Sequence, residues 1–166
     1  MPLKQLELLR HAKSSWDDPD IADHDRPLNA RGRAAAALVG RHMREQTPPP
    51  DLVLCSSATR TRQTLQLLEL AAGTQVRVED ELYGAGAAGL LARLQAVPAT
   101  VGTVLLIGHN PGIEDLTRML DRDALSSVQK FPTAALAVLR FDIGTWNELD
   151  PGTGHLATFF TPRDLA

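Results

Sequence analysis

The fold of this chain is predicted outward from Leu6-Glu7-Leu8-Leu9-Arg10-His11-Ala12-Lys13, where an apolar run ends abruptly in a charged pair. Residues 4–9 indicate a short first strand, so Arg10 and His11 follow its last residue directly. An arginine beside a histidine at the end of a buried strand can hold a phosphate and attack it. An isolated Arg-His pair is more often an ordinary loop feature, so a phosphate site here has to be supported by other parts of the sequence.

Two further apolar runs end in the same kind of residue. Residues 52–55 lead into Arg60, residues 104–107 lead into His109, and a helical pattern follows each run. Alternating strands and helices imply a largely parallel sheet with helices on both faces. Ligands in such sheets bind beyond the carboxyl ends of the strands. We therefore expect the two arginines and the two histidines to lie together at that edge.

Helices are predicted between the strands. Asn29 is a candidate N-cap for a helix whose apolar face carries Ala35, Leu38, Val39, His42 and Met43. Ser56 or Ser57 caps the next helix, residues 89–97 form another, and Asn110 caps the last, with proline at its first position. The helix starts near Ser57 and Asn110 would aim free N–H groups at the same edge, which favours bound anions and makes both residues candidates for substrate binding.

The remaining strands complete an α/β fold. Residues 76–78 indicate a brief third strand, and residues 134–141 and 155–160 indicate two late strands. The short link between the late strands favours an antiparallel pair at the sheet edge. We expect one domain over residues 1–166, a three-layer sandwich with a mostly parallel sheet, helices on both faces and an antiparallel edge strand.

Composition restricts the classes of function. The chain has 43% hydrophobic residues and a formal net charge of -3, which argues against disorder and against general attraction to nucleic acid. One cysteine, Cys55, excludes an intramolecular disulfide and fits a reducing compartment. No apolar run is long enough for a membrane span or a targeting segment. We expect a soluble cytoplasmic protein, most simply a monomer, with no cofactor and no nucleic-acid or membrane partner.

Four short blocks of the sequence, taken in their order along the chain, indicate a family resemblance. Residues 8–13 contain the Arg-His-Ala run, and residues 25–32, 55–64 and 106–111 form the other three blocks. Together they resemble the signatures of the histidine phosphatase superfamily, and within it the small SixA-type phosphohistidine phosphatases. The similarity spans nearly the whole chain, so the resemblance implies a phosphohydrolase that needs no metal.

The resemblance also implies roles for individual residues. His11 would be the nucleophile that forms a phosphohistidine intermediate. Arg10, Arg60 and His109 would bind the phosphoryl oxygens, and Arg26 would complete the cationic rim. The alternative for Arg26 is a surface ion pair with Asp23 or Asp25. The implied substrate bears a phosphate and is best explained as a phosphohistidine on a protein, because the loops around the pocket are too short to enclose a small metabolite.

The general acid is the catalytic role for which several residues compete. Larger relatives carry a carboxylate on an inserted helical segment, which this chain is too short to contain in that form. Glu81 is the best candidate, and Glu79 and Asp80 compete with it; a solvated turn is the alternative for all three. A phosphorus–nitrogen bond to imidazole breaks more readily than a phosphate ester, so a weak or absent acid would be tolerable for phosphohistidine.

Other functions stay open at this point. A cysteine-dependent phosphatase would need an arginine six residues after Cys55, but that position is Thr61. A metal-dependent hydrolase would need closely spaced metal ligands, and the sequence contains no closely spaced pair of His or Cys residues. A non-catalytic phosphate-binding module and a broad small-molecule phosphomonoesterase would both use the same pocket residues.

Overall fold

The computed structural model describes residues 3–123, 128 and 130–166. Its centre is a six-stranded sheet with the order β3-β2-β4-β1-β5-β6. The strands are β1 (Lys4–Arg10), β2 (Leu52–Ser56), β3 (Gln75–Glu79), β4 (Thr103–Gly108), β5 (Leu136–Phe141) and β6 (Gly154–Phe160). Strands β1 to β4 run parallel, β5 pairs antiparallel with β1, and β6 pairs antiparallel with β5. The predicted mostly parallel sheet with an antiparallel edge pair is confirmed.

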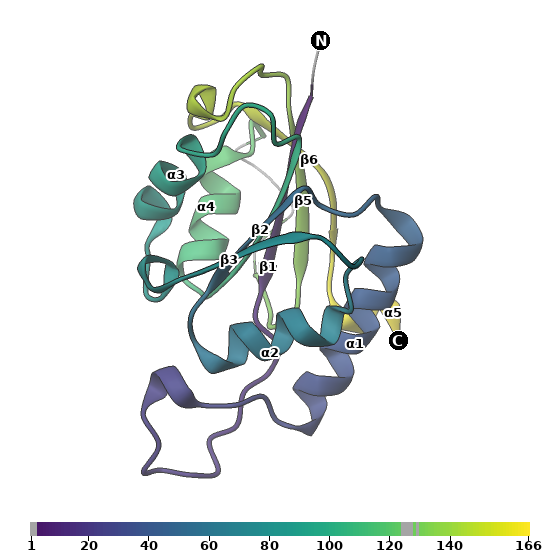
Figure 1. Cartoon of the computed structure of the whole chain (residues 1–166), viewed down its shortest axis with the longest axis vertical. Coiled ribbons are helices and arrows are strands. Elements are labelled where there is room, and N and C mark those ends of the chain that lie inside the picture. The colour runs from purple at the N-terminus through teal and green to yellow at the C-terminus, as the bar shows by residue number, and fades with distance from the viewer. Residues whose placement is uncertain (1–2, 124–127, 129) are drawn as a thin grey trace.

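Helices cover both faces of the sheet (Figure 1). One face carries α1 (Ala30–Gln46), α2 (Thr59–Leu68) and the short α5 (Pro162–Leu165). The other carries α3 (Ala87–Gln95) and α4 (Gly112–Leu120). Three 3₁₀ turns lie in the connections, η1 (Asp23–Asp25), η2 (Asp80–Leu82) and η3 (Trp146–Glu148). The three-layer prediction is confirmed, and none of the helices described could span a membrane.

Strand β4 shows why the centre of the sheet is uniformly apolar. Val104 and Leu106 pack in the core under α3 and α4, whereas Leu105 and Ile107 pack in the core under α1 and α2. All four side chains are fully buried. A strand that is covered on both faces needs no polar alternation, which explains the uninterrupted apolar run of residues 104–107.

Helix α1 begins where its sequence predicts. The Oδ1 atom of Asn29 accepts a hydrogen bond of 2.8 Å from the backbone N–H of Gly32, which confirms Asn29 as the N-cap. The helix contacts α2 closely at Gly40, where a Cβ atom would lie 2.5 Å from the backbone of Leu68. Only a glycine allows this approach, which packs α1 against the last turn of α2.

Two helix starts differ from prediction by one or two residues. Helix α2 begins at Thr59 with Ala58 at the N-cap position, so neither Ser56 nor Ser57 caps it. Helix α4 begins at Gly112, and Asn110 accepts a hydrogen bond of 3.2 Å from the N–H of Glu114. In both cases the polar side chain near the helix start has another role, because each lies at the crowded carboxyl edge of the sheet.

Candidate active site

The predicted phosphate-binding residues meet at the carboxyl ends of the parallel strands. Arg10 ends β1 and His11 follows it, Arg60 lies in the first turn of α2, and His109 follows β4. In Figure 1 the segment between β1 and α1 extends beyond this same edge of the sheet. A cavity of about 320 Å³ is lined by Arg10, His11, Lys13, Ser14, Trp16, Arg26, Arg60, His109, Asn110 and Thr133.

His11 has the geometry of a nucleophile. Its Nδ1 atom lies 2.7 Å from the carbonyl oxygen of Ala12, so a proton on Nδ1 is donated there and Nε2 keeps its lone pair. The side chain is 7% exposed, and burial lowers its pKa to about 3, with the nearby His109 and Arg60 adding to the effect. At neutral pH the ring is therefore uncharged, which is the form that attacks phosphorus.

Three buried nitrogen atoms around the cavity have no hydrogen-bond partner among the described residues. They are Nε of Arg10, Nε of Arg60 and Nδ1 of His109. An unsatisfied buried polar atom costs about 1–3 kcal/mol, so such atoms rarely gather at one place without a ligand that satisfies them. Two guanidinium N–H groups and an imidazole N–H are suited to the oxygens of a phosphoryl group.

The Arg10 side chain is held by the backbone of Phe131, which lies between α4 and β5. Its Nη1 atom donates to the carbonyl oxygen of Phe131 at 2.9 Å, and Nδ2 of Asn110 donates to the same oxygen at 3.0 Å. The N–H of Phe131 in turn donates to Glu114 at 2.7 Å. Asn110 therefore lies at the cavity as predicted. Its amide N–H group helps to position Arg10, because both side chains donate to the same carbonyl oxygen.

His109 is held by a neighbouring serine that the sequence interpretation missed. Its Nε2 atom lies 2.8 Å from Oγ of the buried Ser56. Burial lowers the pKa of His109 to about 4, with Arg60 adding to the effect, so this ring is also neutral at pH 7. Its centroid lies 5.2 Å from that of His11, which places both imidazoles within reach of one bound phosphoryl group.

Asp23 connects the cationic residues. Its Oδ2 atom accepts hydrogen bonds from the Tyr83 hydroxyl at 2.6 Å and from Nη2 of Arg60 at 3.1 Å. Its Oδ1 atom accepts from Nε of Arg26 at 3.1 Å, and its backbone oxygen accepts from Nη1 of Arg60 at 2.7 Å. The Tyr83 hydroxyl and the two guanidinium groups hold the pKa of Asp23 well below its usual range.

Arg26 makes two kinds of contact. It forms the ion pair with Asp23, and it also lines the cavity. Its Nη1 atom donates to Oγ of Ser14 at 2.6 Å, and the guanidinium carbon lies 3.5 Å from the centroid of the Trp16 ring. Arg26 is 6% exposed, whereas Trp16 is 75% exposed at the mouth of the cavity.

Some candidate residues do not reach the cavity. Glu81 is exposed and does not line it, and both carboxylate oxygens of Glu79 accept hydrogen bonds from Arg93, at 2.6 and 3.0 Å. Ser57 also lies outside the lining, where its Oγ is 2.9 Å from Nε2 of His24. Cys55 is fully buried, and burial raises its thiol pKa to about 12, as expected for a packed strand cysteine.

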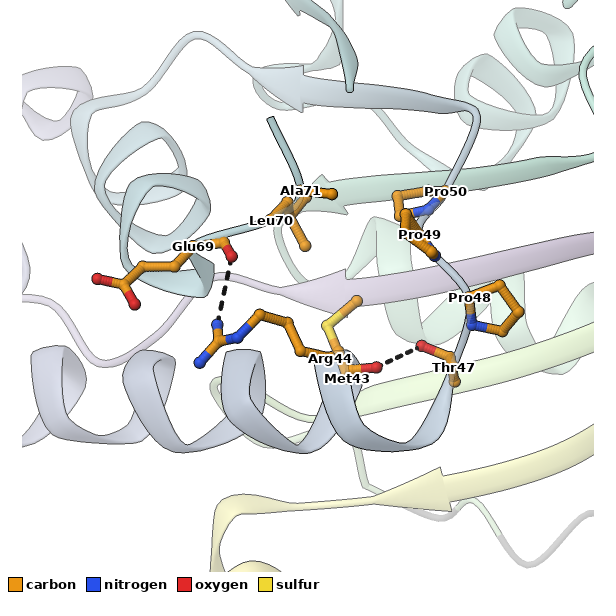
Figure 2. Close-up of a pocket in the computed structure, with 9 residues that line it drawn as sticks. All are labelled: Met43, Arg44, Thr47, Pro48, Pro49, Pro50, Glu69, Leu70 and Ala71. Carbon is orange, nitrogen blue, oxygen red and sulfur yellow. Dashed lines mark hydrogen bonds between the residues drawn. The ribbon is translucent and has the colours of Figure 1, made fainter. Parts of the chain in front are cut away.

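A second pocket, of about 270 Å³, lies at the opposite, amino-terminal edge of the parallel strands (Figure 2). Its wall is mostly apolar and consists of Met43, Arg44, Thr47, Pro48, Pro49, Pro50, Glu69, Leu70 and Ala71. The guanidinium of Arg44 is engaged by the backbone carbonyl oxygens of Leu68 and Glu69. This lining contains no imidazole and no unengaged arginine, so the phosphate chemistry belongs to the first cavity.

Comparison with known proteins finds similar sequences and structures over most of the chain. The family model of the histidine phosphatase superfamily (branch 1) matches residues 6–86, which contain Arg10, His11, Arg26 and Arg60. An uncharacterized protein of Mycobacterium tuberculosis is 40% identical over 162 residues, which cover 93% of this chain and all of the relative. A similar protein of Mycobacterium leprae is 37% identical, over 93% of this chain and all of its own length.

Solved structures show the same similarity in three dimensions. A SixA protein from Nakamurella multipartitia superposes with a TM-score of 0.88 and 37% identity, covering 98% of each chain. The protein histidine phosphatase SixA complexed with tungstate superposes with a TM-score of 0.82 and 28% identity, covering 98% of this chain and 99% of the other.

Proposed function

Because this chain belongs to the histidine phosphatase superfamily, we propose that it is a phosphohistidine phosphatase with His11 as its nucleophile. The observation that carries the proposal is the group of three unsatisfied buried nitrogen atoms around one cavity, on Arg10, Arg60 and His109. They surround a histidine whose Nδ1 is bound to a backbone carbonyl and whose Nε2 is free to attack. A binding module would need the donors, but it would not need the neutral imidazole.

The reaction has two steps. In the first, the Nε2 lone pair of His11 forms a bond to phosphorus, and the bond from phosphorus to the substrate nitrogen breaks with its electron pair on that nitrogen. In the second, water attacks the phosphorus and His11 leaves with its original lone pair. Arg10, Arg60 and His109 donate to the phosphoryl oxygens in both steps, where the charge on those oxygens is rearranged.

The choice of phosphohistidine rests on three supports. The similar SixA structures carry that activity in their names, and one of them holds tungstate, a tetrahedral oxyanion like phosphate. The described residues that line the cavity include no carboxylic acid, which a phosphoimidazole tolerates and an alkyl ester does not. The mouth is bordered by the exposed Trp16, so a side chain on a protein surface can enter.

A substrate panel tests this proposal. We expect kcat/KM for a phosphohistidine peptide to exceed that for alkyl phosphates such as glycerol phosphate by at least a hundredfold, and we expect no loss of rate after treatment with EDTA. A clear preference for any alkyl ester would identify a small-molecule phosphomonoesterase. Tight binding of the peptide without turnover would identify a recognition module, and a rate that EDTA removes would require a metal.

A further inference from the structure

The position of Asp23 is informative about the leaving group. In-line attack places the leaving nitrogen on the side of phosphorus opposite Nε2 of His11. His11 is 7% exposed at the inner end of the cavity, whereas the side chain of Asp23 is 49% exposed. Asp23 is also bound to Arg26 and Arg60, both of which line the cavity. Asp23 does not itself line the cavity, but it binds two residues that do, and its own side chain is open to solvent, where a leaving group can depart.

Asp23 can accept one more hydrogen bond. A carboxylate has about four acceptor sites, two on each oxygen. The Oδ2 atom already accepts from Tyr83 and Arg60, but the Oδ1 atom accepts only from Nε of Arg26 among the described residues. One acceptor site of Oδ1 thus remains for a donor that enters the mouth of the cavity.

We propose that Oδ1 of Asp23 accepts the N–H of the imidazole ring of the substrate phosphohistidine and stabilises the ring in its protonated, cationic form. This inference rests on the proposed function and adds to it a residue that determines specificity for phosphohistidine. An imidazole nitrogen takes up a proton near neutral pH, so the substrate itself supplies the acid that a phosphate ester would need from the enzyme.

Transfer of the phosphoryl group from the cationic ring to His11 needs no additional proton donor. The Nε2 atom of His11 forms its bond to phosphorus while the bond from phosphorus to the substrate ring breaks. The electron pair of that bond passes to the ring nitrogen, and the cationic ring becomes a neutral imidazole. Its proton stays on the distal nitrogen, hydrogen-bonded to Asp23. No proton has to be delivered to the leaving atom, so Glu81 is not needed for this substrate.

The charges around Asp23 support the same assignment. The titratable groups that face it are Arg26, Arg60, Tyr83 and His109, and His24 packs against Tyr83. The Tyr83 hydroxyl and the two arginines keep the carboxylate ionised throughout the range in which an imidazole titrates. Without this negative charge the cationic ring would meet the guanidinium groups of Arg10, Arg26 and Arg60 with only the phosphoryl group to oppose them.

The substitution Asp23→Asn removes the charge and keeps an oxygen acceptor for the arginines. We expect it to lower kcat/KM for a phosphohistidine peptide at least tenfold more than kcat/KM for p-nitrophenyl phosphate, whose leaving group needs no proton. The fall of kcat with rising pH, measured at saturating peptide, should move to lower pH by about one unit. Asp25→Asn is the matched control, because this exposed carboxylate is paired with His24, whereas Asp23 is paired with the cavity residues Arg26 and Arg60; it should change neither substrate by more than twofold.

Equal losses of the variant on both substrates, with an unmoved pH profile, would show that Asp23 only positions the arginines and would overturn the proposal. Unchanged activity on both substrates would overturn it as well, because the carboxylate would then not reach the ring. The wild-type protein separates this failure from that of the proposed function. If it hydrolyses p-nitrophenyl phosphate and leaves the phosphohistidine peptide intact, both proposals fall together.

Discussion

The hydroxyl oxygen of Ser56 lies 2.8 Å from Nε2 of His109, across the neighbouring carboxyl ends of β2 and β4. When the hydroxyl donates to Nε2, the neutral ring carries its proton on Nδ1, the atom with no partner among the described residues. The contact therefore determines which nitrogen of His109 can donate to a phosphoryl oxygen.

Ser56→Ala should lower kcat/KM about tenfold by freeing the His109 ring, a loss on the scale of one hydrogen bond. The measurement is a double-mutant cycle with His109→Ala, and the second substitution should add little once His109 is absent. Fully additive losses would show that Ser56 acts on catalysis by another route.

Arg60→Ala and His109→Ala should each lower kcat/KM by roughly 10²–10³, the scale for loss of a preorganised donor to a developing charge. Arg62→Ala is the matched control, since Arg62 lies on the same helix but is exposed and donates to the Ser57 carbonyl. The assignment fails if neither variant at the cavity loses more than threefold, or if the control loses as much as they do.

Most of the fold could be predicted because its pattern is local. The apolar runs of β1, β2 and β4 lie in the covered centre of the sheet, where burial on both faces leaves a continuous signal. The start of α2 could not be placed as well, because Ser56 turns toward His109 and does not cap the helix. That choice depends on a strand about fifty residues away in the sequence.

The two histidines of the cavity should stay neutral well below the pH at which a histidine side chain usually takes up a proton. Burial lowers the pKa of His11 to about 3 and that of His109 to about 4, so neither ring should titrate in ¹⁵N NMR spectra between pH 8 and pH 5. The unfolded chain takes up these protons near pH 6.5, so both histidines reduce the free energy of unfolding as the pH falls from about 6.5 toward 3. Midpoints near 6.5 in the folded protein would contradict this.

Glu7 should make the fold less stable at alkaline pH. Its side chain is fully buried on β1, its Oε1 atom has no partner among the described residues, and burial raises its pKa to about 7. The folded state holds the proton that the unfolded state loses near pH 4.5, so stability is present below that pH and is lost as the pH rises through about 7.

Glu7→Gln should therefore raise the free energy of unfolding at pH 8 by on the order of 2–3 kcal/mol and change it little at pH 5. Denaturant unfolding at the two pH values measures the difference. Glu45→Gln is the control, because that carboxylate is exposed beside Arg41 and should show no such dependence. An equal change of Glu7→Gln at both pH values would show that the carboxyl does not titrate there.

The residues of the site could be predicted only where they belong to one of the sequence motifs. Arg10, His11, Arg60 and His109 line one cavity because each ends a strand, follows one or lies in the first turn of the next helix, all at the same sheet edge. Asp23, Tyr83 and Ser56 were missed as site residues, since each acts through a contact between distant segments. The one available signal was the spacing of Asp23, three residues before Arg26.

Formation of a phosphoenzyme on His11 tests the central claim most directly. The protein should be mixed rapidly with a ³²P-labelled phosphohistidine peptide, quenched in alkali, and digested so that the labelled peptide can be identified by mass spectrometry. We expect an acid-labile, base-stable adduct on His11 that is absent in His11→Ala, and a loss of turnover of several orders of magnitude in that variant. A label on any other residue, or turnover of His11→Ala near the wild-type rate, would contradict the account.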